Sequence, residues 1–430
     1  MGRFFSSTVE TALRDIYYQM WTGRGKEALQ SLEQASAAGD GDASCVLARC
    51  YSGEQYVWDG HGFPEDGRKA ASLLRRSVKQ GSALGVLICL RSGVMTPALE
   101  EEMPFDSLQE AFDAVLEKAR AGEPFCQYTV GNVYFWWDFL RIQGKSQEDF
   151  PSRQAFRDYL KENIAKCEDW FWKAFRGGVY WGGINLKNYY QNGAEDLIRP
   201  QPAKAVDIDR IGAEYGYPYY QYFYALGLKR AGKKEEAYAL FRKAADCGEK
   251  KAYCDAGFAY YNGWGGPKDA ARAAQCFAGG MELPINRELC AGWLGIFYFR
   301  GEGVEQDYAK AFQLLKWTDD QGTQGSWLVY YLGACCANGW GTVQDYEMAR
   351  RYLERVDWNC PDGFYLLGYL YANGLGGPQD IQKGVQLLQK AGDHSQAKEE
   401  LKHYKKTFFG GKGFADDSGL GSFGRNSLHL

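Results

Sequence analysis

The sequence predicts an all-α fold, a solenoid of stacked helical hairpins, and three regularities in its C-terminal half carry this prediction. Four glycine-containing motifs recur, with their first glycines 38, 38 and 35 residues apart. Another glycine stands six residues before each of these glycines, and an aspartate stands six residues after it. A fixed period of this size is typical of small units that bury their apolar faces only by stacking. The motifs occupy residues 262–265, 300–303, 338–341 and 373–376.

Each period is interpreted as two helices joined by a glycine hinge. In the last copy Leu367 and Tyr371 stand at helical spacing, and the helix is expected to stop at Gly374, where a left-handed backbone is tolerated. Asp380 is expected to cap the second helix, because an aspartate at that point accepts backbone N–H bonds. Gly384, which is alanine in the other copies, lets the two helices approach closely. Connections this short predict antiparallel neighbours.

The period divides the chain into four predicted parts. Residues 1–251 are expected to form degenerate helical repeats with aromatic-rich insertions, and residues 252–391 to form four regular repeats. Residues 392–406 are expected to form a capping helix, and residues 407–430 a flexible glycine-rich tail.

The repeat pattern resembles the Sel-one-like repeat family, which is related to tetratricopeptide repeats. The resemblance is specific over residues 252–391, which follow the form Leu/Ala-Gly-x-x-Tyr-x-x-Gly-x-Gly-x-x-x-Asp-x-x-x-Ala, and fragmentary over 12–251. The third copy departs from the form, with Cys336 in place of the tyrosine. The resemblance implies a right-handed superhelix of α-hairpins that acts as an adaptor for other proteins. It also implies a bacterial source, because most soluble members without an added catalytic domain are bacterial.

Composition and spacing argue against several classes of function. The 50 Lys and Arg residues are balanced by 54 Asp and Glu residues and form no basic run, so we expect no nucleic-acid partner. No apolar stretch is long enough for a membrane span. The four histidines lie far apart and there is no Cys-x-x-Cys, so we expect no metal, no cofactor and no catalytic residue. The twelve scattered cysteines are expected to be reduced core thiols, which indicates a cytoplasmic protein.

The first helix of each regular repeat carries a candidate partner-binding face. Residues three before the helix glycine, one after it and four after it share that face. The resemblance implies that the first helices line the concave wall, where Phe and Tyr rings suit a protein or peptide partner. The alternative is that these rings fill the space between neighbouring repeats. The candidate residues are Phe258, Tyr261, Ile296, Phe299, Tyr330, Tyr365 and Tyr369.

These observations predict a non-catalytic scaffold or adaptor that binds a partner protein or peptide. One alternative is a small-molecule-binding protein or a hydrolase, with a pocket under the aromatic insertion at residues 126–182, which contains Trp136 and Trp172. A second alternative is a bacterial effector or defence component that acts by binding a protein through the same groove.

Overall fold

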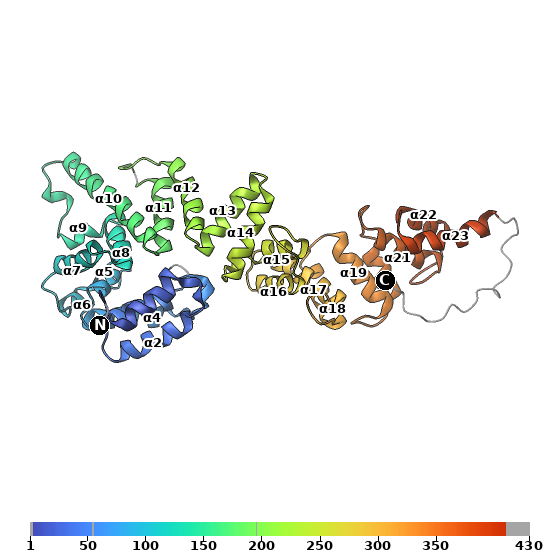
Figure 1. Ribbon diagram of the computed structural model, residues 1–430, viewed down its shortest axis with the longest axis horizontal. Coiled ribbons are helices and arrows are strands. Elements are labelled where there is room, and N and C mark those ends of the chain that lie inside the picture. Colours follow the sequence, from blue (N-terminus) through green and yellow to red (C-terminus); the bar gives the residue numbers. More distant parts are fainter. Residues whose placement is uncertain (1–2, 54–55, 195, 410–430) are drawn as a thin grey trace. The chain divides into compact units, whose positions relative to one another are not determined.

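A computed structural model describes residues 3–53, 56–194 and 196–409, and gives only the backbone for residues 405–409. Over these ranges the regular elements are helices without a single β-strand, and an isolated bridge joins Ala194 to Ile198. The all-α prediction is therefore confirmed, whereas the right-handed sense of the superhelix stays a prediction. The chain divides into two compact units, Met1–Ala252 (unit 1) and Tyr253–Leu430 (unit 2) (Figure 1).

Unit 1 consists of helices that pack mainly on their neighbours in sequence, and its insertions carry short helical turns. The α-helices are α1 (Ser7–Leu13), α2 (Gly25–Ala37), α3 (Gly41–Tyr51), α4 (Gly67–Lys79), α5 (Ala83–Arg91), α6 (Pro97–Glu101), α7 (Leu108–Arg120), α8 (Pro124–Phe135), α9 (Asp138–Ile142), α10 (Arg153–Arg176), α11 (Tyr180–Asn192), α12 (Pro202–Glu214), α13 (Pro218–Arg230) and α14 (Lys234–Asp246). The short turns are η1 (Arg14–Tyr18), η2 (Met20–Thr22), η3 (Asp59–His61), η4 (Gln147–Asp149) and η5 (Lys250–Ala252).

Contacts between residues far apart in sequence join separate segments of unit 1. The Trp58 indole Nε1 donates a hydrogen bond to Glu249 Oε2 at 3.1 Å, across 191 residues. Tyr18 donates to Glu123 on the N-terminal side of α8, and the Tyr17 ring lies 4.8 Å from that of Phe125. Residues 14–21 thus contact the start of α8, and residues 57–61 contact Glu249, which follows α14.

The aromatic insertion forms part of the core of unit 1. The sequence predicts that residues 170–175 supply the partner of the helix around Gly131, and α10 does pack along α8. A Cβ on Gly131 would lie only 2.6 Å from the Phe171 ring, so this glycine allows the two helices to touch. Phe171 and Phe175 are fully buried.

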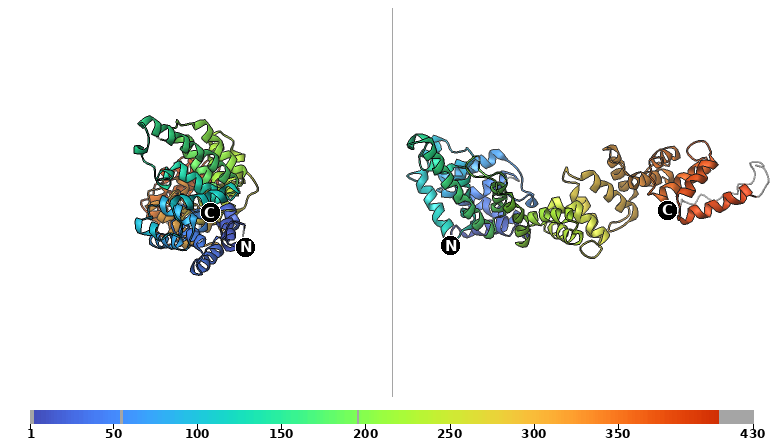
Figure 2. Two further views of the ribbon diagram at one scale, coloured as in Figure 1. Left: turned by 90° about the vertical axis from the view of Figure 1, so that its left-hand side faces the viewer. Right: turned by 90° about the horizontal axis from the view of Figure 1, so that it is seen from above.

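Unit 2 repeats one hairpin four times and ends in a further helix (Figures 1 and 2). Its helices are α15 (Tyr253–Asn262), α16 (Ala270–Gly280), α17 (Arg287–Arg300), α18 (Tyr308–Asp320), α19 (Ser326–Asn338), α20 (Tyr346–Leu353), α21 (Pro361–Ala372), α22 (Ile381–Lys390) and α23 (Ser395–Phe409). The helix α23 continues to Phe409, so residues 407–409, expected in the tail, are helical. The remainder of the predicted tail, residues 410–430, lies outside the described residues.

In the second, third and fourth repeats, the second hinge glycine packs directly against the second helix of the preceding repeat. In the third repeat both Gly339 and Gly341 have positive φ, and a Cβ on Gly341 would lie 2.0 Å from the carbonyl oxygen of Tyr308, the first residue of α18. Asp345 then caps α20 by accepting a bond from the backbone N–H of Met348 at 2.9 Å. The same close approach places Gly303 on Ala270 and Gly376 on Tyr346.

The predicted caps and close helix approaches are confirmed in all four repeats. The capping aspartates are Asp269, Asp307, Asp345 and Asp380. Each helix glycine faces an apolar side chain of the second helix: Gly257 faces Phe277, Gly295 faces Leu315, Gly333 faces Leu353 and Gly368 faces Leu388. Every hairpin therefore shares the same cap and the same close approach between its two helices.

Candidate functional site

The seven predicted residues all lie on the first helices of unit 2, and the structure separates them by exposure. Ile296, Phe299 and Tyr365 are 2%, 8% and 6% exposed. The other four are half-buried and reach the surface: Phe258, Tyr261, Tyr330 and Tyr369.

Two of the buried residues pack against the following repeat or the last helix. The Phe299 ring lies 4.9 Å from the ring of Tyr331 and 5.5 Å from that of Trp340, both in the next repeat. The Tyr365 ring stacks on His394, just before α23, at 4.5 Å. These rings contribute to the packing of one element on the next.

Arg300 connects three successive first helices and was not among the residues predicted from the sequence. At the same point of the other hairpins an asparagine side chain donates to the carbonyl four residues earlier, as Asn338 does to Ala334 at 3.0 Å. Arg300 instead donates from Nη1 to the hydroxyl of Tyr261 at 3.0 Å, and its guanidinium lies 5.5 Å from the ring centre of Tyr331. Its departure from asparagine is the sequence signal that could have identified it.

Tyr330 and Asp362 extend the row toward the last hairpin. The Tyr330 ring lies 4.9 Å from that of Tyr331, and burial followed by the negative charge of Asp362 raises the pKa of the Tyr330 hydroxyl. That hydroxyl therefore stays protonated at neutral pH and can donate a hydrogen bond. Asp362 is exposed and lies 3.2 Å from Nε2 of His394.

We call this row the tyrosine surface and define it by five residues with exposed or half-buried side chains: Tyr261, Arg300, Tyr330, Asp362 and Tyr369. It presents aromatic rings, hydroxyl groups and one charge of each sign. Such groups bind by contact area and by hydrogen bonds to a ligand. The row holds no pair of side chains arranged as nucleophile and base.

In unit 1 a cavity of about 20 Å³ lies beside Arg49, Arg91, Asn132 and Asp138, which is room for a single water molecule. Burial raises the pKa of Asp138 to about 6. The described residues contain no cluster of three His, Cys, Asp or Glu side chains that could hold a metal ion. Nor does any described helix have the length and apolar character needed to cross a membrane.

The fold and this surface define an α-hairpin repeat protein. Sel1 repeats match at residues 46–82, 213–249, 250–278, 290–316, 329–355 and 363–395. The chain is therefore a member of the Sel1-like repeat proteins, as the resemblance predicted. Two of the matches, 46–82 and 213–249, fall in the part where the sequence pattern was fragmentary.

Similar solved structures are also repeat proteins. One is c5321, described as a protective antigen of uropathogenic Escherichia coli with an SLR fold; it is 17% identical, with 88% of this chain and 90% of that chain covered and a TM-score of 0.37. Another is a Sel1 repeat protein from Oxalobacter formigenes, 19% identical, with 74% of this chain and 93% of that chain covered and a TM-score of 0.34. The search of curated proteins found no match.

Proposed function

We propose that this protein is a non-catalytic scaffold that binds a segment of a partner protein on the tyrosine surface of unit 2. The observation that carries the proposal is the position of Arg300. The asparagine that ends the first helix in the other repeats is replaced by Arg300, which contacts both Tyr261 and Tyr331. This arrangement orders side chains at the surface before any partner arrives, which lowers the entropy cost of binding.

The chemistry of the tyrosine surface supports a peptide ligand. Tyrosine rings supply contact area at a low entropy cost, and their hydroxyls hydrogen-bond to a peptide backbone. Arg300 and Asp362 are exposed and of opposite charge, so they suit a segment that carries both an acidic and a basic residue. Sel1 repeats typically mediate protein–protein interactions, which agrees with this role.

Unit 2 is a better location for the site than unit 1. In unit 1 the chain's own residues 14–21 and 57–61 lie against the inner helices, including α8. A partner would have to displace these segments. In unit 2 the four half-buried aromatic residues of the first helices are partly exposed among the residues that the structure describes.

We further propose a bacterial cytoplasmic setting. All twelve cysteines are free thiols, and eleven of them are buried. Free thiols in this number are typical of a reducing compartment. The alternative of a bacterial effector or defence component shares the same mode of action and differs only in the partner.

Comparative affinity purification tests the proposal. Tagged full-length protein is expressed in its native cell, and co-purifying proteins are quantified for the wild type and for Arg300→Ala combined with Tyr330→Ala. Loss of central interface anchors weakens binding by about 2 kcal/mol or more, so the partner should fall by about tenfold or more. The matched control combines Lys316→Ala with Arg351→Ala on the second helices α18 and α20. Equal recovery of every co-purifying protein by the two double variants would contradict the proposal.

A further inference from the structure

The second helix of the third hairpin is the shortest of the four in unit 2. The helix α20 has 8 residues, whereas α16, α18 and α22 have 11, 13 and 10. The spacing of the hinge glycines falls from 38 residues to 35 across the same hairpin. The helix α20 therefore ends at Leu353. The end of a longer helix would contact the next hairpin, α21 and α22, at this point.

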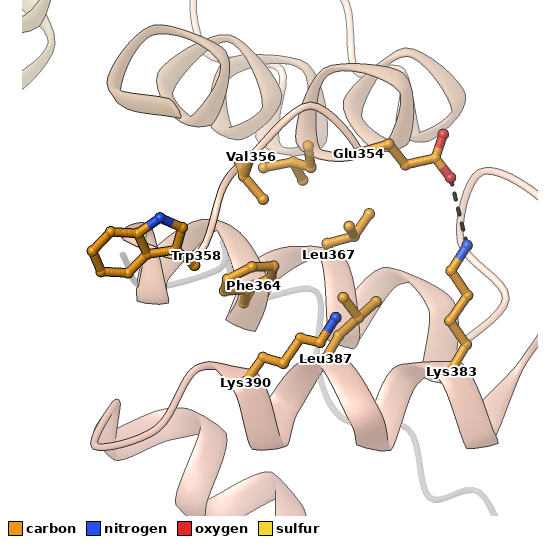
Figure 3. A pocket seen from close by; sticks show the side chains of 9 residues that line it. Glu354, Val356, Trp358, Phe364, Leu367, Lys383, Leu387 and Lys390 are labelled. Carbon is orange, nitrogen blue, oxygen red and sulfur yellow. Dashed lines mark ion pairs between the residues drawn. The ribbon is translucent and has the colours of Figure 1, made fainter. Parts of the chain in front are cut away.

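A slot of about 640 Å³ lies at this place (Figure 3). Phe364 and Leu367 of α21 form its back wall, and Leu387 of α22 forms one side. The ion pair between Glu354 and Lys383, 3.8 Å apart, closes one end. At the opposite end stands Trp358, which is 85% exposed. An indole this exposed beside an apolar wall is an unusual feature of a surface without a ligand.

In the preceding repeat an ion pair occupies the corresponding position. There Asp319, near the end of α18, holds Arg355 through two bonds of 2.6 and 3.2 Å. Lys390 stands 35 residues after Arg355, as Leu388 stands 35 residues after Leu353. Because α20 ends early, Lys390 has no carboxylate within 4.0 Å among the residues that the structure describes. Its amino group points into the slot (Figure 3).

We propose that the slot binds a short helical segment of a partner protein that carries a bulky apolar side chain and an aspartate or glutamate. The apolar side chain contacts Phe364, Leu367 and Leu387, and the carboxylate pairs with Lys390 as Asp319 pairs with Arg355. The bound segment replaces the helical turns that α20 lacks. Two observations favour this ligand: the positive charge of Lys390, and the ion pair by which Asp319 of α18 binds Arg355 in the preceding repeat.

This slot is separate from the tyrosine surface. On α21 the slot residues Phe364 and Leu367 are about 100° or more around the helix axis from Tyr365 and Tyr369, at about 100° per residue. The inference therefore does not rest on the function proposed above, and variants of one surface leave the other unchanged.

The test uses a defined probe, a fluorescein-labelled peptide with the sequence of residues 308–321, which is α18 with its acidic end. Its binding to the full-length chain is measured by fluorescence anisotropy. We expect saturable binding that weakens about fivefold in Lys390→Glu, because Lys390 is exposed and the change replaces an attraction at the surface with a repulsion. The matched control is Lys402→Glu, the same change on exposed α23, which should leave binding unchanged. A probe with lysine at both aspartate positions should bind Lys390→Glu better than it binds the wild type.

Several results would overturn the proposal. One is the absence of saturable binding to the wild type up to about 1 mM probe, the weak end of specific association. Another is equal affinity for the wild type and Lys390→Glu. A loss of binding in Arg300→Ala with Tyr330→Ala would place the probe on the tyrosine surface instead. Binding that needs removal of residues 410–430 would assign the slot to the chain's own end, and a dimer that dissociates in Trp358→Ala would assign it to a second copy.

Discussion

Gly341→Ala should uncouple adjacent repeats, and Gly339→Ala should not. Both glycines have φ near +70°, at which an added Cβ costs about 1–2 kcal/mol. At Gly339 the nearest atoms to an added Cβ lie 3.4 Å away, on Gln344, so only this backbone cost applies. At Gly341 the Cβ would lie 2.0 Å from the Tyr308 carbonyl oxygen, which is fixed at the start of α18. Overpacking of this kind adds about 1–3 kcal/mol. We therefore expect about 1–2 kcal/mol of destabilisation for Gly339→Ala and about 2–5 kcal/mol for Gly341→Ala.

The assay compares both variants with the wild type by urea unfolding followed with circular dichroism. Hydrogen exchange of α18 and α19 locates the change, because loss of one interface in a repeat array loosens its neighbours first. Gly341→Ala should speed exchange in α18, the helix that its hinge contacts, more than Gly339→Ala does. Equal unfolding midpoints and equal exchange for the two variants would refute the argument that the second hinge glycine is needed for contact between repeats.

Two further predictions concern a helix cap and a buried carboxylate. Asp345→Ala should lower the free energy of unfolding by about 1 kcal/mol, whereas Asp345→Asn, which keeps the acceptor, should change it by less than half of that in the same urea titration. Burial raises the pKa of Asp138 from 3.8 to about 6, so between these values the native state binds a proton that the unfolded state releases. Wild-type stability should thus gain about 1 kcal/mol relative to Asp138→Asn when the pH falls from 7.5 to 5, at about 1.4 kcal/mol per pKa unit for the full shift. A constant difference between the two proteins across this range would show that Asp138 titrates normally.

The internal geometry of the hairpins could be predicted from the sequence because it is local. The first hinge glycine, the capping aspartate and the small residue of the second helix all act within one repeat, on neighbours fewer than 20 residues away. Gly339, Asp345 and Ala349 illustrate this, since each is required by backbone conformation, a cap or a close approach inside one hairpin. Four tandem copies made the pattern unambiguous.

The candidate site was only partly predictable, because its exposure depends on the next repeat. Helical spacing places Phe299 and Tyr330 on one face, but the rings of Tyr331 and Trp340 cover Phe299 and leave Tyr330 half-buried. The spacing of residues along one helix does not show which of them the following hairpin will cover. Arg300 was missed for the opposite reason, because its position in the motif suggested a helix end and its partners lie in two other helices.

The interior of unit 1 could not be predicted from local patterns. The hydrogen bond between Trp58 and Glu249 joins residues 191 positions apart, and no local pattern in the sequence pairs them. The slot is an intermediate case. The shortened spacing of 35 residues is visible in the sequence, but the slot beside Phe364 and Lys390 depends on where α20 ends.

Hydrogen exchange on the complex with the captured partner tests most directly whether the first helices of unit 2 bind another protein. We expect slower exchange in peptides that contain Tyr261, Arg300 and Tyr330, on α15, α17 and α19, with α16 and α18 unchanged. Protection confined to α16 and α18, or to unit 1, would contradict this expectation.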